Sequence, residues 1–478
     1  YVGYQYDLAL LDQFNFNYRK GGFDLGGMLF GSDYKFENNK IITQKTYLDK
    51  VWTQNSDMKN PTHSQYLSAM LSLNYQFNEN HVMGVRYDFN RSPKTEMRAY
   101  MNSSIHVDNL LEEESKSKLH SNTTNNSHTV NAYYNGSFND WKVDFNVDGM
   151  WIDNNNPTVS EENVKKPDNT EDNRIIHTLG NSSNELYAAK LIMDHPLWGG
   201  SFSIGSEYTY SNRIDRYAND ENIIPDNENR IRENAVSAFA MYARSFGQLQ
   251  AQAGVRYEHL GSDYYEFGKR MDEQSRTYDN VFPSISISYP IGKVQMMLSY
   301  SGNIERPSYN NLSSSIIYAN KYTYESGNPF LRSSILNTLS FNTSWKWLYF
   351  SMNYSHIKDM QTQISQSYSD EDPSISLFTH TNVPKMDKLN ATLSASPTIG
   401  IWSPQFTAMY SQQWLVMDTP DGPKNLNNPI GYFQWNNTFS FHKKFQFSID
   451  LETSTRGEDI TYRTIKPGSS VNLSLYKG

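Results

Sequence analysis

The chain has 478 residues, a net charge of −9 and no cysteine, and it is rich in tyrosine (34), phenylalanine (24) and tryptophan (9). The acidic balance argues against nucleic-acid binding, which needs a basic surface, and the lack of cysteine excludes disulfides and thiol chemistry. No run of about 18 apolar residues is present, so a membrane-spanning helix is excluded.

Strands with one apolar and one polar face follow each other along the chain. Near the N-terminus, Phe14, Phe16 and Tyr18 alternate with asparagines. Residues 67–77 alternate in the same way, and after a polar turn at residues 78–80 the alternation resumes over residues 83–89. A period of two is typical of a half-buried strand, so residues 64–90 are predicted to form a long β-hairpin. Most of the sequence repeats this hairpin.

Short turns and long polar segments alternate. The nine predicted short turns lie at residues 19–22, 78–80, 139–140, 198–200, 246–248, 290–293, 346, 399–400 and 442–444. The predicted extracellular loops lie at residues 32–63, 93–127, 153–184, 216–233, 264–279, 302–335, 358–387, 413–430 and 454–468. Residues 153–174 are almost wholly polar and are predicted to be mobile, and residues 110–114 are predicted to form a short helix.

The turns fix the number of strands. Eight intervals between nine turns give 16 strands, one strand precedes Lys20 and two follow Lys443, which makes 19, and residues 1–6 are the end of another. One such strand would also fit a soluble sandwich, but this succession of short turns and long loops is typical of outer-membrane barrels. We therefore expect an all-β fold, a transmembrane antiparallel β-barrel over residues 1–478 with about 20 of 22 strands present.

The pattern also predicts which side chains face lipid. Leu67, Leu71, Leu73, Val255, Ile287 and Phe447 are expected to point outward, and Ser72, Asn74, Arg256 and Ser286 inward. Lumen-side charges, such as Arg86 with Asp88 or Arg256 with Glu258, are expected to pair with each other or with a plug. The final strand, residues 469–476, is expected at an open edge, and we expect that a final hairpin beyond Gly478 would be needed to close the barrel.

Two stretches near the middle of the chain carry a family resemblance. Residues 305–312 read Glu-Arg-Pro-Ser-Tyr-Asn-Asn-Leu, and residues 327–332 read Gly-Asn-Pro-Phe-Leu-Arg. Both resemble stretches late in the barrels of TonB-dependent outer-membrane receptors, and residues 17–21 and 456–457 fit the same outer-membrane β-barrel group. The family more often has a proline after a basic residue where this chain has Arg332 and Ser333.

The resemblance implies a function and a location. It implies a 22-stranded barrel in the outer membrane of a Gram-negative bacterium, with outer-membrane lipid around it. It also implies an N-terminal plug domain of the same protein, upstream of Tyr1, and energy from an inner-membrane TonB-type complex. A surface lipoprotein is a further possible partner. The alternatives are a structural barrel that scaffolds surface lipoproteins or an assembly complex, and a passive porin of about 16 to 18 strands.

Five residues form the candidate ligand-binding site: Arg306, Tyr309, Tyr318, Tyr322 and Tyr324. Aromatic rings with a guanidinium make a platform for a sugar, a peptide or an aromatic chelate. The alternative is that these side chains form a rim girdle or pack the loop onto the barrel mouth.

Other chemistry has little support in the sequence. Asp370, Glu371 and Asp372 lack the glycine and distal glutamate of a calcium loop, and they are interpreted as a solvated charge run. The histidines show no metal-ligand spacing. No nucleophile motif or phosphate loop is present, so we expect no metal, no cofactor and no enzymatic activity.

Overall fold

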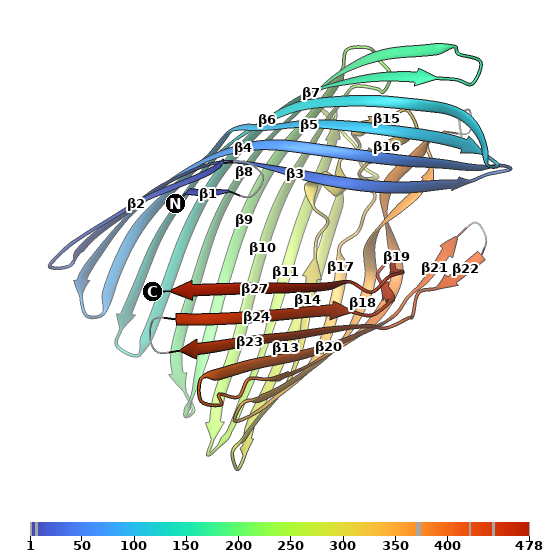
Figure 1. Ribbon diagram of the computed structural model, residues 1–478. Coiled ribbons are helices and arrows are strands. Elements are labelled where there is room, and N and C mark those ends of the chain that lie inside the picture. Colours follow the sequence, from blue (N-terminus) through green and yellow to red (C-terminus); the bar gives the residue numbers. More distant parts are fainter. Residues whose placement is uncertain (1, 5–7, 370–373, 420–421, 442–444, 478) are drawn as a thin grey trace.

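The computed structural model describes all residues except 1, 5–7, 370–373, 420–421, 442–444 and 478. One large sheet of 23 strands dominates it. The sheet curls round, so that the red C-terminal strands lie in front of the green middle strands (Figure 1). The described part of the chain has no helix long and apolar enough to cross a membrane.

The principal strands pair with their neighbours in sequence, and all of these pairs are antiparallel. In order they are β1 (Val2–Tyr4), β2 (Leu8–Lys20), β3 (Phe23–Tyr47), β4 (Val51–Asn78), β5 (His81–Val107), β6 (Leu110–Phe138), β7 (Trp141–Lys165), β8 (Glu171–Leu197), β9 (Gly200–Asn219), β10 (Asn227–Phe246), β11 (Leu249–Glu266), β13 (Arg276–Ile291), β14 (Val294–Glu305), β17 (Ser334–Trp345), β18 (Leu348–Ser367), β19 (Ser376–Ala395), β20 (Trp402–Trp414), β23 (Ile430–Phe441), β24 (Phe445–Ser454) and β27 (Ser469–Lys477).

Short elements fill the connections on one side. They are β12 (Lys269–Arg270), α1 (Tyr309–Leu312), β15 (Ile316–Asn320), β16 (Thr323–Ser326), β21 (Val416–Thr419), β22 (Gly422–Asn425), β25 (Gly457–Asp459) and β26 (Tyr462–Thr464). The all-β fold is confirmed, and so is the predicted count of 19 long strands, with β1 as the partial one.

The short turns lie on one rim, as predicted. The turns at Glu79 and Ile399 are separated by an even number of antiparallel strands, so they fall on the same side, and Figure 1 shows the hairpin turns together at the lower left. Gly21 (φ +58°) and Gly292 (φ +60°) adopt the left-handed backbone that such two-residue turns require. The ninth predicted turn, at residues 442–444, lies outside the described residues.

The first three predicted loops are wrong. Strands β3 to β8 run for 25 to 29 residues without a long break, whereas a tilted strand needs about 9–11 residues to cross a bilayer. The predicted mobile segment 153–174 forms the ends of β7 and β8, and the predicted helix at 110–114 is the start of β6. Beyond the bilayer the outer face of a strand contacts water instead of lipid, and the inner face buries polar side chains such as Ser160 and Glu162, so these ends lose the apolar alternation that marks a strand in lipid. We call the ends of β3 to β8 that project beyond the bilayer the raised wall.

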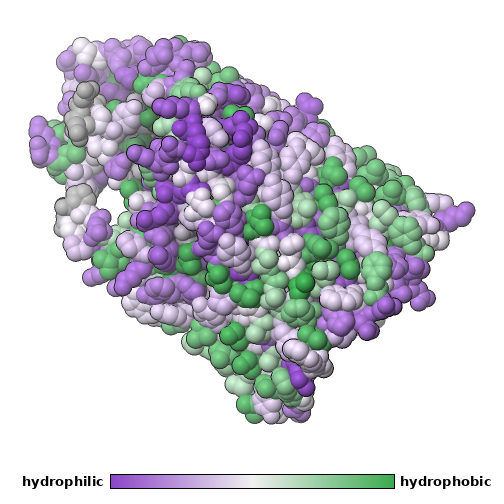
Figure 2. Space-filling view, turned by 180° about the vertical axis from the view of Figure 1, so that it is seen from behind, coloured by the Kyte–Doolittle hydropathy of each residue, from purple (hydrophilic) through white to green (hydrophobic). Residues whose placement is uncertain are grey.

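Apolar side chains cover the outer face of the sheet. Leu71, Val255 and Ile287 are 47%, 46% and 44% exposed, while Ser72 and Asn74 are half-buried on the inner face. Figure 2 shows apolar side chains gathered on the part of the molecule nearer the short turns and hydrophilic ones towards the opposite end. A band of exposed apolar side chains is what a lipid-facing barrel surface requires.

Predicted charge pairs and the predicted open edge are both found. Arg86 bonds Asp88 at 2.7 Å, and the Arg256 guanidinium lies 3.4 Å from Glu258. Within the described residues β27 pairs only with β24 and β1 only with β2, so no ladder joins these two edges of the sheet (Figure 1).

The segment between β14 and β17, residues 306–333, folds inward and is anchored on the raised wall. We call it the inserted segment. Lys321 Nζ lies 2.8 and 2.9 Å from the carboxylate of Glu113 on β6, whose side chain is 2% exposed, and the Tyr322 hydroxyl donates to the same group at 2.6 Å. The Tyr318 hydroxyl donates to Glu162 on β7 at 2.5 Å. These buried carboxylates fix the inserted segment in one position against the wall.

We predict that Leu71→Arg impairs barrel assembly and that Ser72→Arg does not. A charge near the bilayer midplane costs about 2 to 4 kcal/mol on the lipid face, whereas a lumen position tolerates it. The measurement is the yield of folded, heat-modifiable barrel in outer-membrane fractions. Equal losses in the two variants would contradict the assignment of inner and outer faces.

We predict that Lys321→Met releases the inserted segment from the raised wall. It leaves the buried Glu113 carboxylate without its cation, a loss on the order of 3–5 kcal/mol. Hydrogen–deuterium exchange over residues 316–326 should then be faster, and Lys321→Met with Glu113→Gln should recover part of the protection. The control is Arg270→Met, which breaks an exposed 2.8 Å pair with Asp263 and should leave the exchange over residues 316–326 unchanged, because solvent screens an exposed pair. Unchanged exchange in Lys321→Met would show that the pair does not anchor the segment.

Candidate ligand-binding site

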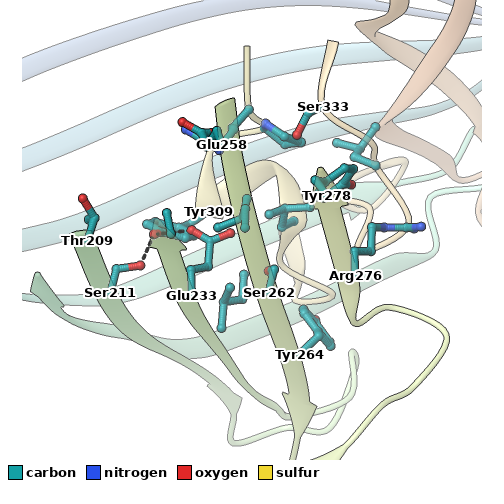
Figure 3. Close-up of a pocket in the computed structure, with 18 of the residues that line it drawn as sticks. Thr209, Ser211, Glu233, Glu258, Ser262, Tyr264, Arg276, Tyr278, Tyr309 and Ser333 are labelled. Atoms are coloured by element: carbon teal, nitrogen blue, oxygen red, sulfur yellow. Dashed lines mark hydrogen bonds and ion pairs between the residues drawn. The ribbon is translucent and has the colours of Figure 1, made fainter. Parts of the chain in front are cut away.

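A cavity of about 370 Å³ lies between the inner wall of the barrel and the inserted segment. The wall contributes Ser211 from β9, Glu233 from β10, Glu258 from β11 and Tyr278 from β13 (Figure 3). These side chains share the inward face because strand residues alternate between the two faces of the sheet. The inserted segment closes the other side with residues 306–309, Leu312, Pro329 and Leu331.

Arg306 binds the wall through a charge network. Its guanidinium donates to the carboxylate of Glu258, which is 6% exposed. Arg256 lies 3.4 Å from both Glu258 and Glu207, so two guanidiniums and two carboxylates balance each other. A buried carboxylate needs such partners because burial disfavours its charged form. Arg306 therefore joins the start of the inserted segment to the wall and presents a cation at the edge of the cavity.

Tyr309, in α1, lies across the cavity from β11 and contacts β9 and β10. Its hydroxyl donates to Glu233 at 2.9 Å and lies 2.5 Å from Ser211 Oγ, as the dashed line in Figure 3 marks for Ser211. Burial, followed by the negative charge of Glu233, raises the pKa of Tyr309 above its ordinary value. The tyrosine therefore stays protonated, and because its one proton goes to Glu233, the Ser211 hydroxyl donates to it.

Three polar atoms of the cavity have no hydrogen-bond partner in the described part of the chain: Ser237 Oγ, Gln274 Oε1 and Arg276 Nε. The Arg276 guanidinium does donate through Nη2 to the Phe330 carbonyl at 2.8 Å. Buried polar groups in proteins are normally satisfied by protein, water or ligand. The lining thus offers a polar ligand the hydroxyl of Ser237, the acceptor oxygen of Gln274 and the donor nitrogen of Arg276.

Gly327 and Asn328 show why the inserted segment has its sequence. A Cβ on Gly327 would lie 2.5 Å from the carbonyl oxygens of Asn310 and Ser313, so only glycine fits against α1. The backbone N–H of Asn328 donates to Asn311 O at 2.6 Å, and its side chain donates to His380 O at 2.8 Å. Gly327 and Asn328, which begin the Gly-Asn-Pro-Phe-Leu-Arg stretch at residues 327–332, therefore pack against α1 and hold it over the cavity.

The structure brings two of the five predicted site residues to this cavity. Arg306 and Tyr309 line it. Tyr318, Tyr322 and Tyr324 are 6%, 9% and 5% exposed and lie at the raised wall, where Tyr318 and Tyr324 pack with Ile176 and Ile224. Their burial places them in the anchor of the inserted segment.

Most of the wall residues of the site were not among the residues predicted from the sequence. Glu233 and Arg276 fell inside predicted loops, although Arg256 and Glu258 were assigned to the lumen. The alternation of β10, continued toward residue 229, could have placed Glu233 on the same face as Ser237. No metal site is found among the described residues, and Asp370, Glu371 and Asp372 lie outside them.

The sequence matches the Outer membrane protein beta-barrel family over residues 139–478. A search of curated proteins gave no match.

Several solved structures have a similar fold. The copper transporter OprC is similar with a TM-score of 0.58 at 9% identity, over 98% of this chain and 71% of that chain. A double mutant of the hemophore receptor HasR of Serratia marcescens gives 0.55 at 10%, over 98% and 74%. A mutant of the ferric enterobactin receptor PfeA of Pseudomonas aeruginosa gives 0.51 at 11%, over 98% and 73%.

The resemblance to TonB-dependent receptors is confirmed at the level of the fold. The family match covers more than half of the chain, and the sheet turns an apolar face outward. This chain therefore belongs to the outer membrane protein beta-barrel family and is a multi-pass protein of the outer membrane of a Gram-negative bacterium.

Proposed function

We propose that this chain is the barrel of an energy-coupled outer-membrane transporter that takes up a scarce solute. The observation that carries the proposal is the size of the sheet. Its 19 long strands and β1 exceed the roughly 16 to 18 strands of passive porins. A lumen of this width is closed by a plug in the large transporters, and the similar structures include a transporter and two receptors.

The cavity under the inserted segment is the proposed place of solute contact. Arg306 and Tyr309 would contact the solute, and its polar groups would bond Ser237, Gln274 and Arg276. Tyr318, Tyr322 and Tyr324 would hold the segment in place. A TonB-type inner-membrane complex and a plug domain of the same protein would then open the lumen, so that the solute leaves the cavity towards the periplasm.

We expect uptake to need both this chain and the proton-motive force. A strain lacking the gene and the complemented strain are compared for accumulation of labelled ferric siderophores, haem, cobalamin, copper, peptides and oligosaccharides, with and without a protonophore. At least one solute should accumulate only in the complemented strain and only without the protonophore. Accumulation that persists with the protonophore would indicate a passive pore and would contradict the proposal.

For the solute so identified, Tyr309→Phe should raise the half-saturating concentration roughly tenfold, because it removes the donor to Glu233 at the cavity. Tyr349→Phe is the matched control, since Tyr349 is 43% exposed and its hydroxyl bonds Asn342 at 3.0 Å. Tyr349→Phe should leave uptake unchanged. Equal effects of the two substitutions would remove Tyr309 from the proposed site.

A second candidate function, a scaffold for a surface lipoprotein, is favoured by apolar side chains at the ends of the raised wall. Ile41, Leu110 and Ile175 are 88%, 76% and 54% exposed there. Exposed apolar patches often mark protein contacts. A photo-crosslinking residue at Ile41 should capture a lipoprotein in cells, whereas one at Phe138, beside a short turn, should not. Absence of a crosslink at Ile41, Leu110 and Ile175 would reject this candidate.

A further inference from the structure

A second cavity, of about 510 Å³, lies on the other side of α1 from the first. Tyr309 and Leu312 of α1 face the first cavity, whereas Asn310 and Asn311 line the second. The raised wall contributes residues 154, 156 and 180–182, and β19 contributes Phe378 and His380. Strand β9 adds Arg213, Asp215, Arg216 and Tyr217. We call this space the outer cavity.

The charges of the outer cavity largely cancel within the protein. Arg213 bonds Asp215 at 2.7 Å, with both side chains about 15% exposed, and it also donates to Asn310 Oδ1 at 2.6 Å. Arg216 bonds Glu228 at 2.8 Å. Glu325 adds an exposed carboxylate to the lining. With its guanidiniums already paired and a carboxylate at its edge, the outer cavity does not select an anionic ligand.

Side-chain amides supply the free hydrogen-bonding capacity. Five asparagines line the cavity: Asn154, Asn156, Asn181, Asn310 and Asn311. In the described part of the chain the side-chain amides of Asn181 and Asn311 have no partner, and Asn156 and Asn310 use only their oxygens. Each amide offers two donors and an acceptor. An independent sign is that Nδ1 of His380 is buried there without a partner.

Two aromatic side chains complete the lining. Tyr217 and Phe378 are half-buried in the wall of the cavity, and Tyr217 packs against the buried cluster of Ile176, Ile224, Tyr318 and Tyr324. A ligand for this surface must carry many hydroxyls and also an apolar face. A sugar ring has both, because its hydroxyls lie around the rim and its C–H bonds form a face that packs on an aromatic ring.

We propose that the outer cavity binds a neutral sugar unit of an oligosaccharide. The asparagine amides bond its hydroxyls, and Tyr217 or Phe378 packs on its C–H face. The inference rests on the proposed function, because it names the class of solute that is captured at the mouth before it reaches the first cavity, beside Arg306 and Tyr309. The volume lies within the range of small-molecule sites in proteins.

The test is direct binding to the protein purified from outer membranes in detergent, measured by calorimetry. The probes are maltotriose, mannotriose and xylotriose, with trigalacturonic acid as the charged comparison and a neutral O-antigen polysaccharide as a membrane-borne source of the same chemistry. At least one neutral probe should bind with an affinity that does not change between low and high salt. Binding of a trisaccharide would indicate a free solute as the ligand, and binding of the O-antigen polysaccharide would indicate a surface glycan.

Asn181→Ala with Asn311→Ala should weaken that binding about tenfold or more, since two hydrogen bonds are lost. The matched control is Asn163→Ala with Asn173→Ala, which removes a bonded asparagine pair on β7 and β8 outside the cavity, and it should bind as the parent does. Heat-modifiable mobility verifies the fold. If the double variant does not fold, Asn156→Ala alone is used and should weaken binding severalfold.

The proposal is overturned if no neutral probe binds, if only trigalacturonic acid binds and does so in a salt-dependent manner, or if the cavity variants bind as the parent does. Binding in detergent needs no energy source. Sugar binding without energy-dependent uptake would therefore overturn only the transport function. Energy-dependent uptake of another solute without sugar binding would overturn only this inference.

Discussion

The hydrogen bonding of the backbone is the constraint on which the rest of this structure depends. Hydrocarbon offers no partner for an N–H or a C=O group, so each strand in lipid must be bonded to a neighbour on both sides. Every long strand from β3 to β24 meets this condition with antiparallel partners. This condition also explains the short turns. Antiparallel strands that pair with their successors in sequence can be joined by a tight turn, and the described short turns all fall on one rim of the barrel.

The same ladder continues beyond the lipid and creates the site. Because β3 to β8 stay paired over 25 to 29 residues, they form a rigid wall above the membrane. Glu113 and Glu162 on this wall are 2% and 3% exposed and hold Lys321 and Tyr318 of the inserted segment. Two cavities then arise on the two sides of α1, each with one wall of rigid strand and one of inserted chain.

The sequence predicted the fold well where lipid constrains it. Residues 67–77 alternate because one face contacts hydrocarbon, and that pattern fixes strand, facing and turn together. It failed at residues 153–174, because the outer face of these strand ends contacts water and their inner face buries polar side chains such as Glu162, so the segment resembles a loop in composition. The site was only partly predictable: Arg306 and Tyr309 could be selected from one short stretch, but Tyr309 bonds Ser211 at a separation of 98 residues. No local pattern contains a contact of that kind.

The wall also gives the mouth of the barrel a direction. Strands β23, β24 and β27, at the C-terminal edge of the sheet, have 12, 10 and 9 residues, less than half the length of β3 to β8 (Figure 1). At about 3.3 Å for each residue, the difference in strand length amounts to roughly 40 to 65 Å. The rim is therefore high on one side and low on the other. The opening is therefore oblique. A bulky molecule at the cell surface can approach it over the short C-terminal strands, whereas the long N-terminal strands block approach from the opposite side.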